Sequence, residues 1–287
     1  MTGVVALIGF GEAGQTFARP GDAVFDHKTD DPVTRQAKLA DYEAAEVEGC
    51  ETARQALDGA AAVLSLVTAD QALIAARNGA GLLEPDALWL DMNSVAPGTK
   101  RAAAIAIEAA GGRYADVAVM APVQPARLNV PLLVAGPHAA DAAAVLAEIG
   151  FTNVQIAGSR VGDASAIKMI RSVMVKGIEA LTAECILAAS RAGVADAVLA
   201  SLDASWKVQG WSERADYNLD RMLVHGLRRS AEMEEVAKAL TDLGVSPAMT
   251  CGTIVRQRAL GALGIPPPDG LAGKLAAIEI QRKEQAA

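Results

Sequence analysis

The feature that most constrains the fold of this chain is a glycine-rich loop that directly follows the apolar run Val4–Ile8: Gly9-Phe10-Gly11-Glu12-Ala13-Gly14. Three glycines at this spacing, between a strand and the start of a helix, are typical of a dinucleotide-binding loop. Gly9 would permit the tight turn, Gly11 would let the backbone approach a pyrophosphate, and Gly14 would let helix and strand pack closely. The alternative is a plain glycine turn, but the strand-turn-helix context favours a cofactor loop made of all six residues.

Asp26 ends the next apolar run and lies 17 residues after Gly9. A dinucleotide-binding loop is usually followed, about 20 residues on, by an acid that bonds the ribose hydroxyls. The shorter spacing here predicts a short first helix. Because an acid at this place repels a 2′-phosphate, Asp26 favours NAD, whereas His27 and Lys28 could instead bind that phosphate and leave NADP as the alternative. A solvated turn is the simpler interpretation of Asp26.

Short apolar runs alternate with Ala-rich helical patterns through the first half of the chain. The runs cover residues 4–8, 23–25, 61–67, 88–92, 114–119, 130–135 and 154–156. Fully apolar strands that alternate with helices predict a parallel sheet covered on both faces. This is the doubly wound Rossmann architecture of α/β proteins.

The pattern changes near residue 160, after which only helical patterns follow. The first of them is long and runs from about Ala164 to Arg191. We therefore predict a dinucleotide-binding Rossmann domain at residues 1–160 and an all-helical domain at residues 161–287, joined by a long interdomain helix.

The charge and composition exclude several classes of function. The formal net charge is −8 and the isoelectric point is near 5.0, which argues against binding to nucleic acid or to an anionic membrane surface. No run approaches the roughly 18 apolar residues of a membrane span. The cysteines, Cys50, Cys185 and Cys251, lack the spacing of a metal site. With no leader-like N-terminal segment, we expect a cytoplasmic protein without a metal.

Two further motifs carry a resemblance to a known family. Asp91-Met92-Asn93-Ser94-Val95-Ala96-Pro97 is similar to a D-x-S-T-x-x-P element, and Gly162 followed by Lys168 is similar to the stretch that bears a catalytic lysine. Together with the glycine loop and the domain plan, these motifs resemble the β-hydroxyacid dehydrogenase superfamily, which includes 6-phosphogluconate dehydrogenases, over essentially the full chain. The resemblance is closest to a subgroup of phosphogluconate dehydrogenase-like proteins with a helical C-terminal domain of poorly assigned function.

The chain departs from this family where the substrate is bound. The family's D-A-P-V-S-G-G loop corresponds here to residues 116–122, in which the serine and both glycines are missing. The asparagine four residues after the lysine is Ser172, and a later K-D-L element corresponds to residues 225–227. The resemblance therefore implies a retained chemistry and leaves the substrate unassigned.

The resemblance implies that Lys168 is the general acid and base of a hydride transfer between nicotinamide and a carbinol carbon. On a helix, Lys168, Arg171 and Ser172 would share one face, since they are three and four residues apart. That face could offer a proton carrier, a clamp for an anion and a hydroxyl. The alternative is an ordinary solvated basic face.

The remaining candidate ligands follow predicted strands or lie in the helical half. Asn93 and Ser94 follow the fourth run, at the sheet edge where ligands bind, and could contact substrate or cap a helix. The end of the third run is expected along the cofactor: Val67, Thr68 and Ala69. His225 and Arg229 would bind an anionic or polyhydroxy substrate, or pair with surface acids.

We expect an NAD(P)-dependent dehydrogenase of a hydroxy acid or similar polar alcohol. An imine reductase of the same plan is one alternative, although such enzymes typically lack the lysine. A non-catalytic dinucleotide sensor is the other alternative. The resemblance implies a homodimer formed through the helical domain.

Overall fold

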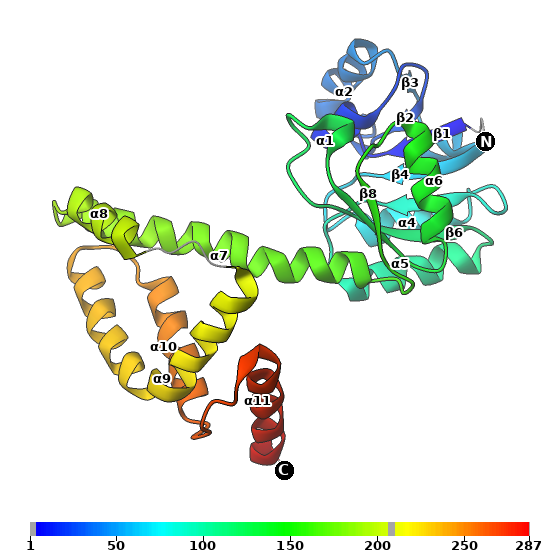
Figure 1. Cartoon of the computed structure of the whole chain (residues 1–287). Helices are drawn as coiled ribbons and strands as arrows, with labels where there is room; N and C mark the ends of the chain where they lie inside the picture. Colours follow the sequence, from blue (N-terminus) through cyan, green and yellow to red (C-terminus); the bar gives the residue numbers. More distant parts are fainter. Residues whose placement is uncertain (1–3, 206–209, 287) are drawn as a thin grey trace. The chain divides into compact units, whose positions relative to one another are not determined.

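The computed structural model describes residues 4–205 and 210–286 (Figure 1). The chain forms two compact units, Met1–Val173 and Met174–Ala287. The division falls inside one helix, α7 (Asp163–Arg191), whose first turns belong to the first unit. Each unit is described by itself below.

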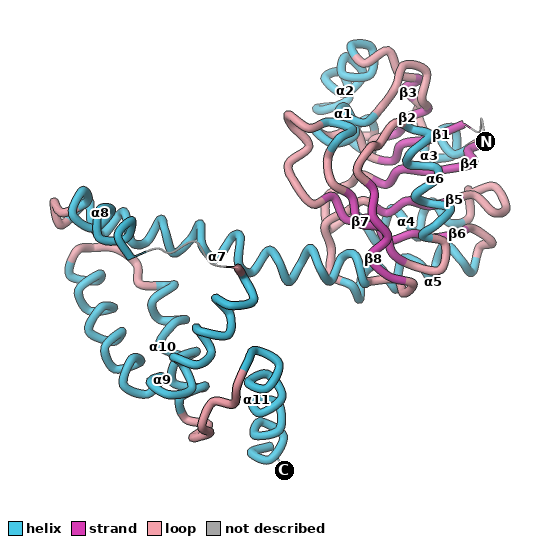
Figure 2. The backbone as a smooth tube through the Cα atoms, in the orientation of Figure 1, coloured by secondary structure: helices cyan, strands magenta, loops and turns pink. Residues whose placement is uncertain are grey.

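The first unit is built on one eight-stranded sheet, with strand order β3-β2-β1-β4-β5-β6-β7-β8 (Figure 2). The strands are β1 (Val4–Ile8), β2 (Ala23–Phe25), β3 (Glu48–Gly49), β4 (Ala60–Ser65), β5 (Leu88–Asp91), β6 (Arg113–Val119), β7 (Leu132–Ala135) and β8 (Val154–Gly158). The doubly wound α/β fold is confirmed. One pair departs from the predicted parallel pattern, because β7 runs antiparallel to β6.

Helices cover both faces of the sheet, as fully apolar strands require. One core contains Phe17 of α1 (Glu12–Phe17), Tyr42 of α2 (Pro32–Ala44) and Leu146 of α6 (Ala139–Ile149). The other core contains side chains of α3 (Ala53–Leu57), α4 (Ala72–Ala80) and α5 (Pro97–Ala109), packed around Trp89. With only six residues, α1 is as short as the spacing between Gly9 and Asp26 predicts.

The second unit is helical in its described residues. It contains the rest of α7, α8 (Ala195–Ser205), α9 (Trp211–Asp242), α10 (Ala248–Gly261) and α11 (Gly270–Ala286). Helices α9 and α10 pack most closely at two glycines. A Cβ atom on Gly226 would lie 2.3 Å from the carbonyl oxygen of Gln257, and one on Gly261 would lie 2.4 Å from the nitrogen of Leu227. The two helix backbones therefore touch where neither carries a side chain.

A buried acid fixes the start of α10. The Glu184 carboxylate accepts hydrogen bonds from the backbone N–H groups of Met249 and Thr250 and from the Thr250 hydroxyl, at 2.8, 3.0 and 2.6 Å. Burial raises the pKa of Glu184, but these three donors outweigh it and hold the pKa below its ordinary value. The carboxylate therefore stabilises this helix start above the ordinary glutamate pKa, and the contribution is lost as the pH falls through the lowered value.

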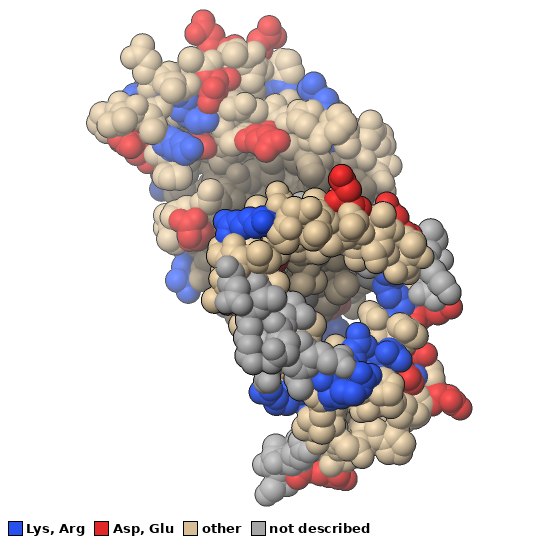
Figure 3. All heavy atoms as spheres, turned by 90° about the vertical axis from the view of Figure 1, so that its left-hand side faces the viewer, with Lys and Arg blue, Asp and Glu red and all other residues tan. Residues whose placement is uncertain are grey.

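The surface carries charges of both signs. On the face drawn in Figure 3, acidic and basic side chains are interspersed with larger uncharged areas, and one group of Lys and Arg side chains gathers in its lower part. Helix α9 carries Arg214, Arg221, Arg228 and Arg229 together with a larger number of acidic residues, so charges of both signs alternate along it. None of the helices in the described ranges is both long and apolar enough to cross a membrane.

The glycine contact between α9 and α10 gives a first prediction. Gly226→Ala places a methyl group against the backbone of α10, and we expect it to destabilise the protein by about 1–3 kcal/mol, the usual cost of overpacking. Gly252→Ala is the matched control within α10, because a Cβ atom there meets no described atom within 4 Å. Thermal unfolding followed by circular dichroism measures both; equal melting temperatures would contradict the contact.

Candidate active site

The glycine loop is shaped by two backbone contacts. Gly9 has a φ of +97°, and a Cβ atom there would lie 2.5 Å from the carbonyl oxygen of Leu66. A Cβ atom on Gly14 would lie 2.6 Å from the carbonyl oxygen of Gly9. Around the Cβ position of Gly11, by contrast, no described atom lies within 4 Å. Gly9 and Gly14 thus close the turn, and Gly11, the N-cap of α1, leaves open space beside the backbone.

Polar groups beneath the loop hold its backbone in place. The Phe10 N–H donates to Asp26 Oδ2 at 2.7 Å, and the Phe10 carbonyl accepts from Lys38 Nζ at 2.8 Å. The Phe10 ring is fully buried against Tyr42, with ring centroids 5.2 Å apart. Of the predicted loop ligands, Phe10 therefore contributes through its backbone, while its side chain belongs to the core.

Asp26 is turned toward the loop. The residue is 6% exposed, and its second carboxylate oxygen accepts from the Lys28 N–H at 3.0 Å and lies 3.6 Å from His27 Nδ1. Its own N–H donates to the Tyr42 hydroxyl at 2.8 Å. Burial, the largest cause, raises the pKa of Tyr42, so this hydroxyl stays protonated. His27 and Lys28 are exposed, so these two side chains, and not the acid, face outward at the end of β2.

A small cavity opens beside this strand end. Its volume is about 110 Å³, and most of its lining is apolar, with His27, Gln71 and Asn78 as polar members. The wall opposite β2 comes from α4 and includes Ile74, Ala75 and Gly79. Gly9 also lines it, so the cavity adjoins the glycine loop. A flat apolar base fits such a place better than a charged group.

A larger cleft of about 460 Å³ brings eight of the predicted site residues together. The glycine loop, the segment after β4, the segment after β5 and the first turns of α7 each contribute to its lining. Those predicted residues are Glu12, Ala13, Val67, Thr68, Ala69, Asn93, Ser94 and Lys168. The segment after β6 adds a wall of Ala121, Pro122 and Val123, in which Ala121 and Pro122 take the place of the two glycines of the family motif.

Lys168 reaches across this cleft to Ser94. Its Nζ donates to the Ser94 Oγ at 2.5 Å, and the lysine is half-buried. Arg171 is exposed and donates to the Met120 carbonyl at 3.4 Å, while the Ser172 hydroxyl donates to the Lys168 carbonyl at 2.9 Å. An amine held beside a hydroxyl at a cleft can deliver or remove a proton there. Ser172, bonded to its own helix, is less available than the sequence predicted.

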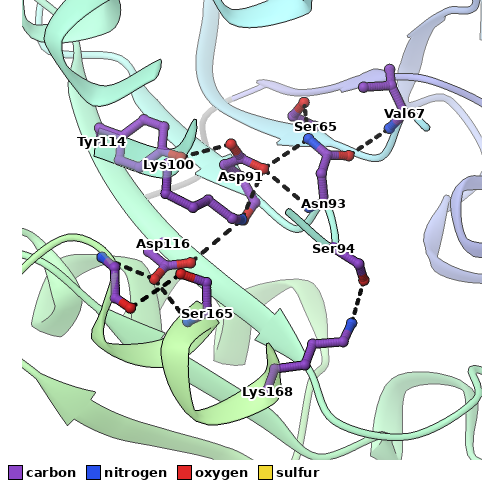
Figure 4. A network of polar contacts seen from close by, with 11 residues as sticks. Ser65, Val67, Asp91, Asn93, Ser94, Lys100, Tyr114, Asp116, Ser165 and Lys168 are labelled. Atoms are coloured by element: carbon purple, nitrogen blue, oxygen red, sulfur yellow. Dashed lines mark hydrogen bonds and ion pairs between the residues drawn. The ribbon is translucent and has the colours of Figure 1, made fainter. Parts of the chain in front are cut away.

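Asn93 serves the protein interior. Its Nδ2 donates to the Ser65 Oγ at 3.0 Å and to Asp91 Oδ1 at 2.7 Å, and its Oδ1 accepts from the Val67 N–H at 2.7 Å (Figure 4). Both N–H groups of this amide are therefore engaged within the fold. Its contacts position the segments that carry Val67 and Ser94, which is a different use from the substrate contact expected.

Sequence reasoning missed Lys100, which is fully buried next to this amide. Its Nζ donates to Asp91 Oδ1 at 2.9 Å and lies 3.4 Å from Asp116 Oδ1. Burial, followed by the charge of Asp91, raises the pKa of Tyr114, whose hydroxyl donates to Asp91 Oδ2 at 2.6 Å. A signal was present, because Lys100 shares the buried stripe of α5 with Ala103, Ala104 and Ile107.

The two predicted ligands in the helical half lie on α9. His225 and Arg229 are both half-buried and one turn apart, on either side of the glycine contact with α10. They belong to the second unit. Their role in holding a substrate stays a prediction.

Comparison with known proteins agrees with the fold and the loop. Residues 4–158 match the family model of the NAD-binding domain of 6-phosphogluconate dehydrogenase, and residues 189–260 match a domain of unknown function, DUF1932. The resemblance predicted from the sequence is thereby confirmed. The residues present fit the dinucleotide, since Gly11 leaves space for a pyrophosphate beside the backbone and Gly9 and Gly14 keep the loop tight.

Solved structures extend the match to the whole chain. A conserved hypothetical protein from Sinorhizobium meliloti is 35% identical over 98% of this chain and 97% of that chain, with a TM-score of 0.59. A conserved protein of unknown function, whose structure is similar to 3-hydroxyacid dehydrogenases, is 30% identical over 90% of this chain and 96% of that chain, with a TM-score of 0.56. An imine reductase from Streptomyces aurantiacus shares the fold, with 19% identity over 95% of this chain and 98% of that chain and a TM-score of 0.69. This chain belongs to the family defined by the NAD-binding domain of 6-phosphogluconate dehydrogenase.

Proposed function

We propose that the protein is an NAD(P)-dependent oxidoreductase that transfers a hydride between nicotinamide and the carbinol carbon of a hydroxy acid or similar polar alcohol. The observation that carries this proposal is the contact of Lys168 with Ser94 in a cleft whose other wall is the glycine loop. A reaction of this kind needs a hydride acceptor next to the carbinol carbon and a proton acceptor next to its hydroxyl oxygen. The cleft has a place for each.

Lys168 carries the proton in this proposal. During oxidation, the neutral amine takes the proton of the substrate hydroxyl while the hydride leaves the carbon that bears this hydroxyl. During reduction, the ammonium returns the proton to the oxygen. The bound nicotinamide supplies the hydride acceptor. Ser94, 2.5 Å from the amine, holds the lysine over the cleft and can hydrogen-bond the same substrate oxygen.

The substrate is proposed to be a small anionic or polyhydroxy molecule. Arg171, on the helix face of Lys168, offers the positive charge that such a molecule needs. His225 and Arg229 are proposed to add a second anion-binding group from α9. The wall of Ala121, Pro122 and Val123 offers no side-chain donor, so the carboxylate of a substrate must be bound from other elements.

The choice between NAD and NADP is proposed to rest on His27 and Lys28 rather than on Asp26. The carboxylate of Asp26 is buried and bonded to two backbone N–H groups, so it is poorly placed both to bond a ribose and to repel a 2′-phosphate. The exposed imidazole of His27 and the exposed ammonium of Lys28 follow it directly. This arrangement favours acceptance of NADP alongside the NAD that the sequence predicted.

We propose that the protein works as a cytoplasmic homodimer. Apolar side chains are exposed on α7 at positions three and four residues apart: Ile167, Ile170, Met174, Ile178 and Leu181. A stripe of this kind is unfavourable in water and is typical of a surface that another chain covers. Light scattering at assay concentration is expected to give twice the mass of one chain. A monomer mass would contradict the proposal.

The role of Lys168 gives a direct prediction. Lys168→Ala should lower turnover by about 10²–10⁴-fold, the usual contribution of a positioned acid or base. The glycine loop is untouched, so the dissociation constant for NADH should not change. Lys283→Ala is the control, since this lysine is exposed near the C-terminus.

Turnover is measured with a panel of hydroxy acids and sugar acids, and with a cyclic imine. Wild-type turnover in Lys168→Ala would refute the acid–base role. Activity on the imine alone would make the protein an imine reductase. Cofactor binding without turnover on any polar alcohol, carbonyl or imine would favour the non-catalytic sensor.

The open space at Gly11 gives a further prediction. Gly11→Ala should leave the melting temperature unchanged, because the new methyl group meets no described atom, yet weaken NADH and NADPH binding by about tenfold or more, which is 1.4 kcal/mol. Gly98→Ala, exposed at the start of α5, is the matched control. Fluorescence titration measures both. Equal affinities of the two variants would place the pyrophosphate elsewhere.

In the same titrations, Lys28→Ala should weaken NADPH binding and leave NADH binding unchanged.

A further inference from the structure

Three charged side chains lie buried together at the edge of the sheet where the cleft opens. Asp91 of β5 and Asp116 of β6 are register neighbours on adjacent strands, and Lys100 of α5 lies between their carboxylates. All three are almost completely buried, with exposures of 1%, 0% and 0%. Two neighbouring carboxylates repel each other, and the ammonium offsets that repulsion.

Stability alone is a weak reason for such a cluster. Removing charges from water costs several kcal/mol for each ion, and well-packed apolar side chains are often at least as stable in the same volume. The rest of the buried stripe on α5 is apolar, so an apolar residue at position 100 would suit its surroundings. The two carboxylates also hold backbone N–H groups of the segments that carry Ser94 and Lys168.

The Asp91 carboxylate holds the segment that carries Ser94. Its Oδ1 accepts from the Asn93 N–H at 3.0 Å and from Asn93 Nδ2 at 2.7 Å. The same Oδ1 accepts from Lys100 Nζ at 2.9 Å. Ser94, whose hydroxyl accepts from Lys168, directly follows Asn93 in the chain.

The Asp116 carboxylate holds the helix that carries Lys168 (Figure 4). Its Oδ2 accepts from the N–H groups of Gly162 and Ser165, at 3.1 and 3.0 Å. These two residues form the start of α7, and Lys168 follows Ser165 by three residues, or about one turn. Asp116 Oδ1 makes no hydrogen bond within the described residues and faces Lys100 Nζ at 3.4 Å.

We propose that Asp116, itself held by Lys100, is a positioning residue that fixes the first turn of α7 on the sheet and thereby sets where Lys168 Nζ lies relative to Ser94 and the cleft. Lys100 joins both halves of the Lys168–Ser94 contact, because it binds the carboxylates that hold each of them. The catalytic consequence rests on the proposed function of Lys168; the geometric one does not.

Asp116→Asn tests this with a change of one atom. The variant keeps the Lys100–Asp91 pair, so the two buried charges that remain are of opposite sign. An amide has one acceptor end and one donor end. Its oxygen will face the charged Lys100, so its NH₂ will face the N–H groups of Gly162 and Ser165 and push the start of α7 away.

The control is Asp163→Asn, at the first residue of the same helix. The Asp163 carboxylate bonds Arg160 at the surface, at 3.2 Å, and does not reach the buried cluster. The main readout needs no substrate. The full-length variants are acetylated with acetic anhydride over a range of pH, and mass spectrometry compares the labelling rate of Lys168 with that of the exposed Lys283.

We expect Asp116→Asn to shift the pH profile of Lys168 labelling and Asp163→Asn to leave it at the wild-type profile. On a substrate from the panel, kcat should fall by about 10²-fold, the cost of a misplacement near 1 Å, while NADH affinity stays unchanged. A folded Asp116→Asn protein with the wild-type labelling profile would overturn the proposal and make the cluster purely structural.

Two further arms keep the outcome decisive. If Asp116→Asn does not fold, Asp116→Ala keeps the buried Lys100–Asp91 pair, removes the acceptor of the Gly162 and Ser165 N–H groups and should show the same shift. Wild-type labelling in that folded variant would also overturn the proposal. If Lys168→Ala retains turnover, the proposed function fails, but the labelling profiles still decide whether Asp116 positions Lys168.

Discussion

The candidate site depends on buried carboxylates that accept hydrogen bonds from the backbone N–H groups of the segments that line the cleft. Asp26 holds the glycine loop through Phe10, Asp91 holds the segment after β5, and Asp116 holds the start of α7. In each case a charged acceptor meets neutral donors, which makes a stronger bond than two neutral groups would. The same type of contact thus fixes three walls of one cleft. Asp26 and Asp91 make it at the carboxyl ends of β2 and β5, and Asp116 makes it to α7 from within β6.

The groups that make these contacts differ in exposure from the groups proposed to touch substrate. The acids are buried while Lys168 is half-buried and Arg171 is exposed. The groups proposed to touch substrate keep access to water, and the groups that orient them do not. The only ammonium in the buried cluster of Figure 4, Lys100, bonds inward to Asp91.

Much of this could be predicted because it follows from local pattern. The apolar runs gave the sheet, and the spacing between Gly9 and Asp26 gave the short α1. Lys168 could be placed on a long helix that begins near the sheet edge because its neighbours follow a helical period. Each of these inferences uses residues close together in the sequence.

What escaped prediction depends on contacts between distant segments. The direction in which Asp26 points is set by Phe10 and Tyr42, sixteen residues away on either side. The stripe of α5 indicates that Lys100 is buried, but the two acids that face it come from β5 and β6. The close approach of α9 and α10 depends on Gly226 meeting Gly261. The antiparallel pairing of β7 with β6 depends on the path of the chain after Val123. For none of these contacts does a short window of sequence contain all the partners.

The position of the unit boundary inside α7 has a consequence for how such proteins diversify. Lys168 and the acid that anchors its helix both precede residue 174, so they are inherited with the dinucleotide-binding unit. A lineage that exchanged everything after that point would receive a new set of helical side chains, with His225 and Arg229 replaced, yet keep its proposed proton carrier on the same unit as the cofactor loop. Chemistry and selectivity can then evolve as separate modules joined by one continuous helix.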